Sequence, residues 1–236
     1  MRFASGIEIT LASSLFLCYN KAINQKCEAR RMTEKRLLIT GFDPFGGETV
    51  NPSWEAVCHL PDRIGTYRLI KQQVPTVYGR AAEIAIAAAE ASAPDAIVCV
   101  GQAGRRAAVT PEVIGINLRE GRIADNAGIL LTNTPIDPCG PAAYFSTLPV
   151  RDMVDAIHAA DLPAALSYSA GAFVCNDLLY SLLHRYRDTS IPIGFIHVPY
   201  LPEQAEEGVP SMPLADIVKA LTAAISVLPD GKETKT

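Results

Sequence analysis

The 236-residue sequence is poor in charged and aromatic side chains, which make up 19% and 7% of it, whereas apolar residues make up 49%. This composition excludes disorder as the dominant state and supplies enough apolar material for a sizeable core. The 21 basic and 25 acidic residues give a net charge of −4 without a dense basic run, so we expect no nucleic-acid partner. No apolar stretch approaches the ~20 residues of a membrane-spanning helix, so we expect no membrane partner either.

The cysteines form no Cys-x-x-C pair and no Cys/His cluster with the spacing of a structural zinc site. We therefore expect reduced thiols in a cytoplasmic protein. The sequence also lacks a phosphate-binding P-loop, a dinucleotide fingerprint, an H-E-x-x-H helix and a G-x-S-x-G turn. The commonest nucleotide, metalloprotease and serine-hydrolase motifs are thus absent. The six cysteines are Cys18, Cys27, Cys58, Cys99, Cys139 and Cys175.

The first 31 residues differ in character from the rest of the chain. The apolar run over residues 7–19 is interrupted by Glu8 and lacks a small-x-small cleavage site, so it matches a secretory signal poorly. Met32 then opens a segment typical of a domain that begins with a strand. We expect residues 1–31 to be an N-terminal extension that is not part of the fold, with a weak targeting segment as the alternative. Residues 32–236 are expected to form one domain.

From Lys35 onward, short apolar runs alternate with helical periodicity, which is typical of α/β proteins. The expected strands are 37–41, 67–74, 96–100, 113–118, 164–169 and 193–198. The expected helices are 53–60 with Ser53 as its cap, 79–93, 150–160, 173–186 and 214–228. The long turn-rich segment between Arg122 and Pro149 is expected to cover a site or to make an interface.

The segment Gly41–Gly47 follows the first expected strand, and open α/β sheets bind ligands beyond the carboxyl ends of their strands. Its two phenyl rings, Phe42 and Phe45, would wall a small apolar pocket if they stay at this edge. The alternative is that both rings fold back into the core, because large apolar side chains are mostly buried.

Cys175 falls in the first turn of the expected helix 173–186, directly after a glycine-containing turn. Unpaired backbone N–H groups and the positive end of the helix dipole are expected to lower the pKa of its thiol. The same N–H groups would receive the negative oxygen of a tetrahedral intermediate. The alternative is that Cys175 is the first residue of a buried stripe at helical spacing.

A nucleophilic cysteine needs a base, and His197 is the best placed of the four histidines. It lies near the carboxyl end of the expected strand 193–198, at the sheet edge to which the turn before Cys175 belongs. His184 follows Cys175 by nine residues, about 900° of helical rotation, so it points to the opposite side of the helix. Three candidates remain open for the carboxylate that orients the imidazole: Glu112, Asp43 and Asp125.

Five blocks of sequence occur in order with compatible gaps. They are GFDPFGGETVNPSWE from Gly41, VGQAG from Val100, the pair Pro111-Glu112, SAGAFVCN from Ser169 and GFIHVPYLPEQ from Gly194. Together they resemble the type I pyroglutamyl peptidases, also called pyrrolidone-carboxylate peptidases. The resemblance covers the chain from about Lys35 to the C-terminus.

This resemblance implies a three-layer α/β/α single domain with a mixed, largely parallel sheet. It implies a cysteine peptidase that removes an N-terminal pyroglutamyl residue from peptides through an acyl-enzyme, with Glu112, Cys175 and His197 as the triad. It also implies that no metal or other cofactor is needed, that the protein is cytoplasmic, and that it is commonly a homotetramer. Further site residues implied by the match are Phe42, Phe45, Asn51, Gln102 and Val174 at the pyroglutamate pocket and Arg122 near the catalytic centre.

Two residues beside the implied triad carboxylate depart from the family pattern. Arg105 replaces the second glycine of Gln-Ala-Gly-Gly-Arg, and Val113 replaces an arginine that usually follows Pro-Glu. These changes bear on the rate and on the local loop geometry. Two alternative functions stay open: a nucleoside-phosphorylase-like enzyme on a similar layered fold, and a catalytically silent pyroglutamyl-binding protein.

Overall fold

The computed structural model describes residues 34–229. The N-terminal extension expected over residues 1–31 lies outside the described residues, so its exclusion from the fold stays a prediction. The unit that begins at Lys35 carries the fold. Within the described part, no helix has both the length and the apolar character needed to cross a membrane.

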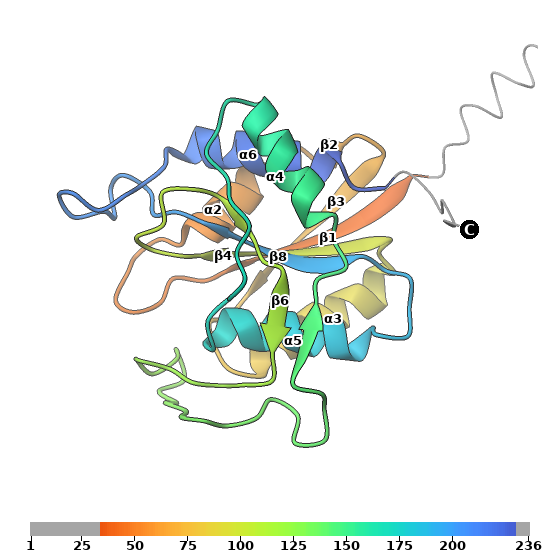
Figure 1. Cartoon of the computed structure of the whole chain (residues 1–236), viewed down its shortest axis with the longest axis vertical. Helices are drawn as coiled ribbons and strands as arrows, with labels where there is room; N and C mark the ends of the chain where they lie inside the picture. Colours follow the sequence, from red (N-terminus) through yellow and green to blue (C-terminus); the bar gives the residue numbers. More distant parts are fainter. Residues whose placement is uncertain (1–33, 230–236) are drawn as a thin grey trace, which may run out of the picture. The chain divides into compact units, whose positions relative to one another are not determined.

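A mixed six-stranded sheet forms the middle layer, in the order β2-β3-β1-β4-β8-β5 (Figure 1). The four central strands run parallel, whereas the short strands β2 and β5 pair antiparallel at the two edges. This confirms the prediction of a mixed, largely parallel sheet. The strands are β1 (Lys35–Phe42), β2 (Arg63–Ile64), β3 (Tyr67–Val74), β4 (Ala96–Gln102), β5 (Thr110–Pro111) and β8 (Ile193–Val198).

Helices cover both faces of this sheet and complete the three layers (Figure 1). Strands β4 and β8 are buried almost throughout, as expected for parallel strands covered on both sides. Alternate residues of β1 contribute to two different cores, with Leu37 and Ile39 in one and Leu38 in the other. On one face lie α2 (Pro52–His59), α4 (Val150–Ala159) and α6 (Leu214–Ser226), and on the other α3 (Arg80–Ser92) and α5 (Val174–Arg185).

The expected strand 113–118 lies outside the main sheet. Its observed part, β6 (Ile114–Ile116), pairs antiparallel with β7 (Ala143–Phe145) in a separate two-stranded sheet. The turn-rich segment that was expected to be a loop therefore contributes β7, which the sequence did not predict.

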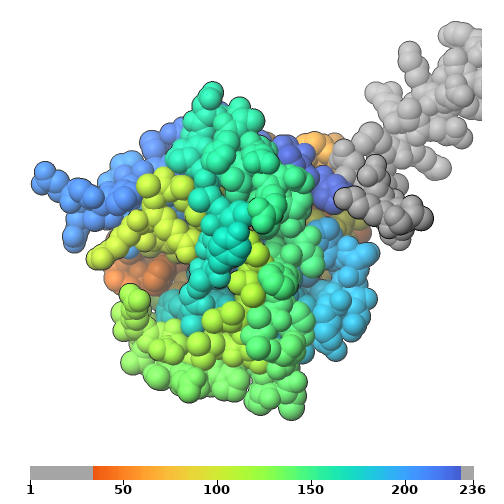
Figure 2. Space-filling view, viewed as in Figure 1, coloured from red at the N-terminus to blue at the C-terminus, as the bar shows by residue number. Residues whose placement is uncertain are grey.

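The predicted strand 164–169 is wrong. The segment crosses the surface in teal in Figure 2 and makes only two isolated bridges, Val109 with Ala164 and Glu112 with Ser167. Between these bridges stands Pro111, which has no N–H to donate, so a continuous ladder cannot form there. The segment nevertheless runs alongside residues 109–113 and leads into α5.

Helix α2 is capped by Asn51 and not by Ser53 as predicted. The Asn51 side-chain oxygen accepts hydrogen bonds from the backbone N–H of Ser53 at 3.1 Å and from its hydroxyl at 2.8 Å. Its amide nitrogen donates to the carbonyl oxygen of Asp43 at 2.8 Å. Asn51 therefore ties the loop after β1 to the start of α2.

We expect Asn51→Ala to lower the free energy of unfolding by about 2 kcal/mol, because it removes a helix cap and leaves buried groups without their partner. Asn51→Asp keeps the cap and loses only the bond to Asp43, so it should cost less. Urea denaturation of the three proteins measures the difference. An Asn51→Ala variant as stable as the wild type would contradict the role given to this side chain.

Candidate active site

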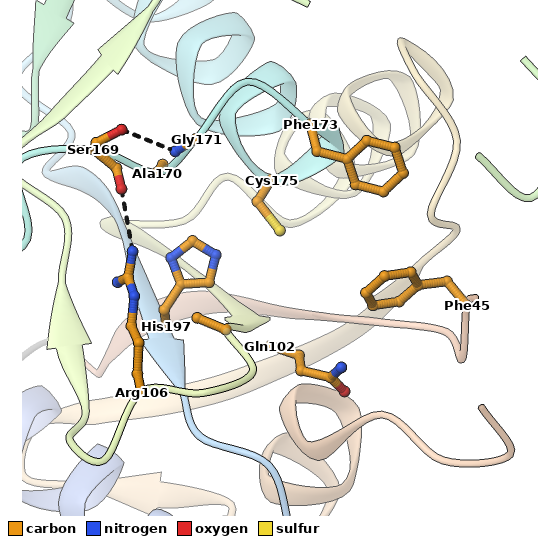
Figure 3. A pocket seen from close by; sticks show the side chains of 10 residues that line it. Phe45, Gln102, Arg106, Ser169, Ala170, Gly171, Phe173, Cys175 and His197 are labelled. Carbon is orange, nitrogen blue, oxygen red and sulfur yellow. Dashed lines mark hydrogen bonds between the residues drawn. The ribbon is translucent and has the colours of Figure 1, made fainter. Parts of the chain in front are cut away.

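A cavity of about 460 Å³ opens at the edge of the sheet where β4 and β8 end (Figure 3). Register in the parallel pair places Gly101 beside His197 and Gln102 beside Val198. Helix α5 begins at the same edge, so Cys175 in its first turn faces this cavity together with His197. The ten lining residues are Phe45, Gln102, Ala103, Arg106, Ser169, Ala170, Gly171, Phe173, Cys175 and His197.

Glu112 is the carboxylate that contacts the His197 imidazole. Its Oε1 lies 2.7 Å from Nδ1 of His197, and the side chain of Glu112 is fully buried. The backbone N–H of Glu112 donates to the carbonyl oxygen of Phe195 at 2.8 Å, which fixes the residue against β8. Because Nδ1 contacts the carboxylate, the other ring nitrogen of His197 is available to a group in the cavity. A carboxylate on one side of an imidazole and a nucleophile on the other is the arrangement of a catalytic triad.

The two competing carboxylates have structural partners instead. Asp43 accepts hydrogen bonds from the backbone of Thr76 and from the side chain of Asn126. Asp125 is buried and accepts from three backbone N–H groups, including that of Tyr78. His184 lies away from the cavity as predicted, with its ring nitrogens near Tyr144 and Asp137.

Arg106 connects the Glu112 carboxylate to the rim of the cavity. Its guanidinium donates to Oε1 of Glu112 at 2.9 Å and to the hydroxyl of Thr110 at 2.6 Å. It also donates to the carbonyl oxygen of Ser169 at 3.2 Å, the contact drawn as a dashed line in Figure 3. One side chain therefore holds both the carboxylate and the turn that precedes Cys175.

The charge environment keeps Glu112 ionised. Burial alone would raise the pKa of this carboxyl, but hydrogen bonds from His197 and Arg106 and the charge of His197 outweigh burial and leave the pKa below its usual value. A lowered pKa means that the carboxylate persists as the pH falls through the range in which an ordinary glutamate takes up a proton. The contribution of ionised Glu112 to the free energy of unfolding is therefore present at neutral pH and is lost only when the pH falls below the lowered pKa.

The expectation that helix α5 makes the resting thiol acidic is wrong. Burial raises the pKa of Cys175 to about 12, and the nearby Glu112 carboxylate acts in the same direction. The charge of Arg106 and the backbone N–H of Cys175 act in the opposite direction but are outweighed. With its pKa raised, the thiol needs a base to remove its proton.

Gly101 allows β4 to pass close beneath the thiol. A Cβ atom at this position would lie 3.0 Å from Sγ of Cys175 and 2.6 Å from the Phe195 ring. Glycine is therefore required by the close approach of three elements and not by an unusual backbone angle.

Of the two phenyl rings in the loop after β1, only Phe45 lines the cavity. It packs against Phe173 with ring centroids 6.1 Å apart, and Figure 3 shows the two rings at one end of the cavity with Cys175 toward the other. Phe42 is 2% exposed, packs against Phe195 and is not among the residues that line the cavity, so its place at the pyroglutamate pocket stays a prediction. As the last residue of β1 it belongs to the sheet, whereas Phe45 lies beyond the strand.

Four other implied site residues have different outcomes. Gln102 lines the cavity at the end of β4. Asn51 and Val174 are buried and do not line it, because the first caps α2 and the second packs in the core beneath α5. Arg122 is exposed and is not among the lining residues, so its place near the catalytic centre stays a prediction, whereas Arg106 pairs with Glu112.

The family departures beside Glu112 leave the carboxylate in place. Arg105 has a φ of +69°, so the chain keeps at this position the left-handed conformation that a glycine adopts without strain. Val113 is half-buried, and its N–H donates to the carbonyl oxygen of Ser167. The substitutions have thus changed the side chains without displacing the hydrogen bond between Glu112 and His197.

Sequence reasoning missed Phe173 and Arg106 as site residues. Phe173 directly precedes the helix that carries Cys175, and its place as the N-cap residue turns its ring toward Phe45. Arg106 stands six residues before Glu112, but only the folded loop brings their side chains together.

Within the described part of the chain, no group of three His, Cys, Asp or Glu side chains could hold a metal ion.

A thiol, an imidazole and a buried carboxylate that meet at one edge of an α/β sheet are the arrangement of a cysteine hydrolase. A family model described as pyroglutamyl peptidase matches residues 35–230. The pyrrolidone-carboxylate peptidase of Levilactobacillus brevis is 50% identical over 198 residues, which cover 82% of this chain and 97% of that protein.

Solved structures agree with the sequence match. The crystal structure of Bacillus amyloliquefaciens pyroglutamyl peptidase I is similar with a TM-score of 0.80 and 46% identity, over 83% of this chain and 97% of that chain. The pyrrolidone carboxyl peptidase of Thermococcus litoralis is similar with a TM-score of 0.79 and 33% identity, over 82% and 93% of the two chains. The chain belongs to the pyroglutamyl peptidase family, which confirms the resemblance and the three-layer α/β fold.

We expect Arg106→Ala to lower kcat by about 10- to 100-fold with little change in KM, because a hydrogen bond to a charged group is lost at the carboxylate that orients His197. The matched control is Arg105→Ala, which removes an exposed neighbouring charge and keeps kcat within about twofold of the wild type. Steady-state kinetics on a fluorogenic pyroglutamyl substrate measures both. Equal losses in the two variants would contradict the role of Arg106.

The raised pKa of Cys175 predicts how its alkylation depends on pH. In His197→Ala no imidazole removes the thiol proton, so the rate with iodoacetamide should rise about tenfold per pH unit toward a pKa of about 12. In the wild type His197 takes that proton, and alkylation at pH 7.5 should be at least ~10-fold faster than in the variant. Peptide mapping of the alkylated thiol provides the rates, and identical pH profiles would contradict the pairing of these two side chains.

Proposed function

We propose that this chain hydrolyses the bond after an N-terminal pyroglutamyl residue of peptides, with Cys175 as nucleophile, His197 as acid and base, and Glu112 as the group that orients His197. The observation that carries the proposal is the shared cavity of Cys175 and His197, with Glu112 2.7 Å from the far side of the imidazole. The family of the chain and the printed names of its relatives supply the substrate class.

In the acylation step, His197 removes the proton from the Cys175 thiol as sulfur attacks the pyroglutamyl carbonyl carbon. The resting thiol is neutral, so proton removal accompanies the attack. The resulting oxyanion lies at the start of α5, where no side chain caps the first-turn N–H groups. Imidazolium then gives its proton to the leaving amine, and the C–N bond breaks to leave a thioester on Cys175.

In the deacylation step, His197 is neutral again and removes a proton from water. The hydroxide attacks the thioester carbonyl, and the thiolate of Cys175 leaves and recovers the proton from the imidazolium. Glu112 stabilises each charged form of His197 and keeps the ring in one orientation, so the same side chain serves both steps.

The cavity suits a small lactam ring. The rings of Phe45 and Phe173 provide apolar faces, and Gln102 provides a polar group at the opposite edge. A polar group that needs a partner rejects analogues without it more strongly than an apolar slot does. Peptides that begin with proline, whose ring has no carbonyl, are therefore expected to react far more slowly.

The proposal also includes a cytoplasmic location and a homotetramer. The four described cysteines are unpaired thiols, as is usual in a reducing compartment. Phe145 and Tyr168 are large rings that are 70% and 64% exposed, and a second copy of the chain could cover them. Light scattering after gel filtration measures the oligomer.

The wild-type protein is expected to release a fluorescent amine from a pyroglutamyl conjugate without added phosphate or metal. Cys175→Ala and His197→Ala should each lower kcat/KM by at least ~10³-fold, because each removes a member of the reacting pair. The control Cys58→Ala removes an exposed thiol of α2 and should retain activity. The assay is run with and without iodoacetamide.

The same assay separates the alternatives. Activity that depends on phosphate would favour the nucleoside-phosphorylase-like enzyme, which the family match already disfavours. Binding of pyroglutamyl peptides without turnover would identify a silent binding protein. Wild-type activity in Cys175→Ala would contradict the assignment of the nucleophile.

A further inference from the structure

Two glutamines from distant parts of the chain meet beside the cavity. Gln102 ends β4 and lines the cavity, whereas Gln204 lies in the loop after β8 and does not. Nε2 of Gln204 lies 3.3 Å from Oε1 of Gln102. The orientation of one amide therefore determines which end of the other amide remains available to a ligand.

The amide of Gln204 is oriented by the backbone. Its Oε1 accepts a hydrogen bond from the N–H of Leu201 at 3.2 Å, and its Nε2 donates to the carbonyl oxygen of Val50 at 3.3 Å. A backbone N–H can only donate and a backbone carbonyl can only accept. Reversing the amide would set two donors against each other and two acceptors against each other, so the network permits only one orientation.

A third acceptor strengthens this orientation. Oε2 of Glu48, in the loop after β1, lies 3.4 Å from the same Nε2 atom of Gln204. The nitrogen end of Gln204 consequently faces only acceptors among these partners. The two N–H groups of Gln204 are shared among these three acceptors, and Gln102 joins this network only by presenting its own oxygen.

The consequence reaches the cavity through Gln102. With its oxygen held by Gln204, the amide nitrogen of Gln102 is the end left for a ligand. In Figure 3 this nitrogen is the atom of the amide on the side of Phe45. The pocket therefore offers a hydrogen-bond donor, and the carbonyl oxygen of a lactam ring is an acceptor that this donor can bind.

We propose that Gln204 is a positioning residue that fixes the Gln102 amide as a donor toward the cavity, so that the site selects an acyl ring that carries a carbonyl oxygen. The inference rests on the proposed function and adds the group that sets its specificity. Gln204 does not touch the substrate and acts only through Gln102.

The test uses Gln204→Glu in the full chain. The introduced carboxylate can still accept from Leu201, but it has no donor for Gln102. The Gln102 amide then turns its nitrogen toward the carboxylate and its oxygen toward the cavity. KM for the pyroglutamyl conjugate should rise by about tenfold with kcat within about threefold, and inhibition by 2-pyrrolidone should weaken by about tenfold.

A double-mutant cycle separates positioning from a general structural effect. In a Gln102→Met background the amide is absent, so Gln204→Glu should add less than about twofold to KM. Gln73→Glu makes the same chemical change at an exposed position of β3 and should leave KM unchanged. If Gln204→Glu does not fold, Gln204→Met replaces it in the same cycle, because it removes both the donor and the acceptor with a similar shape.

The outcomes distinguish this inference from the proposed function. Failure of the wild-type protein to cleave the pyroglutamyl conjugate would overturn the proposed function itself. Wild-type cleavage with an unchanged KM in Gln204→Glu, or an equal rise in KM with and without Gln102, would overturn only the role of Gln204.

Discussion

The hydrogen bond between Glu112 and His197 is the interaction on which the rest of the site depends. A fully buried carboxylate is costly unless charged and polar partners compensate it, and here His197 and Arg106 both contact its Oε1 atom. Because the same arginine also binds the rim carbonyl of Ser169, the charge that stabilises Glu112 also fixes the chain that leads into α5. Arg106 therefore contacts both the carboxylate that binds His197 and the turn that precedes Cys175.

The pKa values of Glu112 and Cys175 are shifted in opposite directions. Glu112 is held as an anion, whereas Cys175 is held as a neutral thiol by burial. In the proposed mechanism, the imidazole held by Glu112 removes the thiol proton and so makes the sulfur nucleophilic. The exposed thiols Cys58 and Cys139 lie outside the cavity.

Much of the fold could be predicted from the sequence, since buried strands such as 67–74 and 193–198 carry their own apolar signature. The strand predicted over 164–169 failed because its ladder depends on Pro111, a residue of another segment. For the site, the first-turn position of Cys175 and the strand-end position of His197 follow from local pattern and topology. The choice of Glu112 over Asp43 and Asp125 required the family resemblance, because only tertiary contacts distinguish three carboxylates.

The positions of Phe173 and Arg106 could not be read from local pattern, because Phe173 packs against a ring distant in sequence and Arg106 meets Glu112 only through a folded loop. The most direct test of the account is peptide mapping by mass spectrometry after acid quenching of the protein during turnover of a pyroglutamyl substrate. The account predicts one pyroglutamyl group attached as a thioester to Cys175. A covalent pyroglutamyl group on any other residue, or turnover that persists without Cys175, would contradict it.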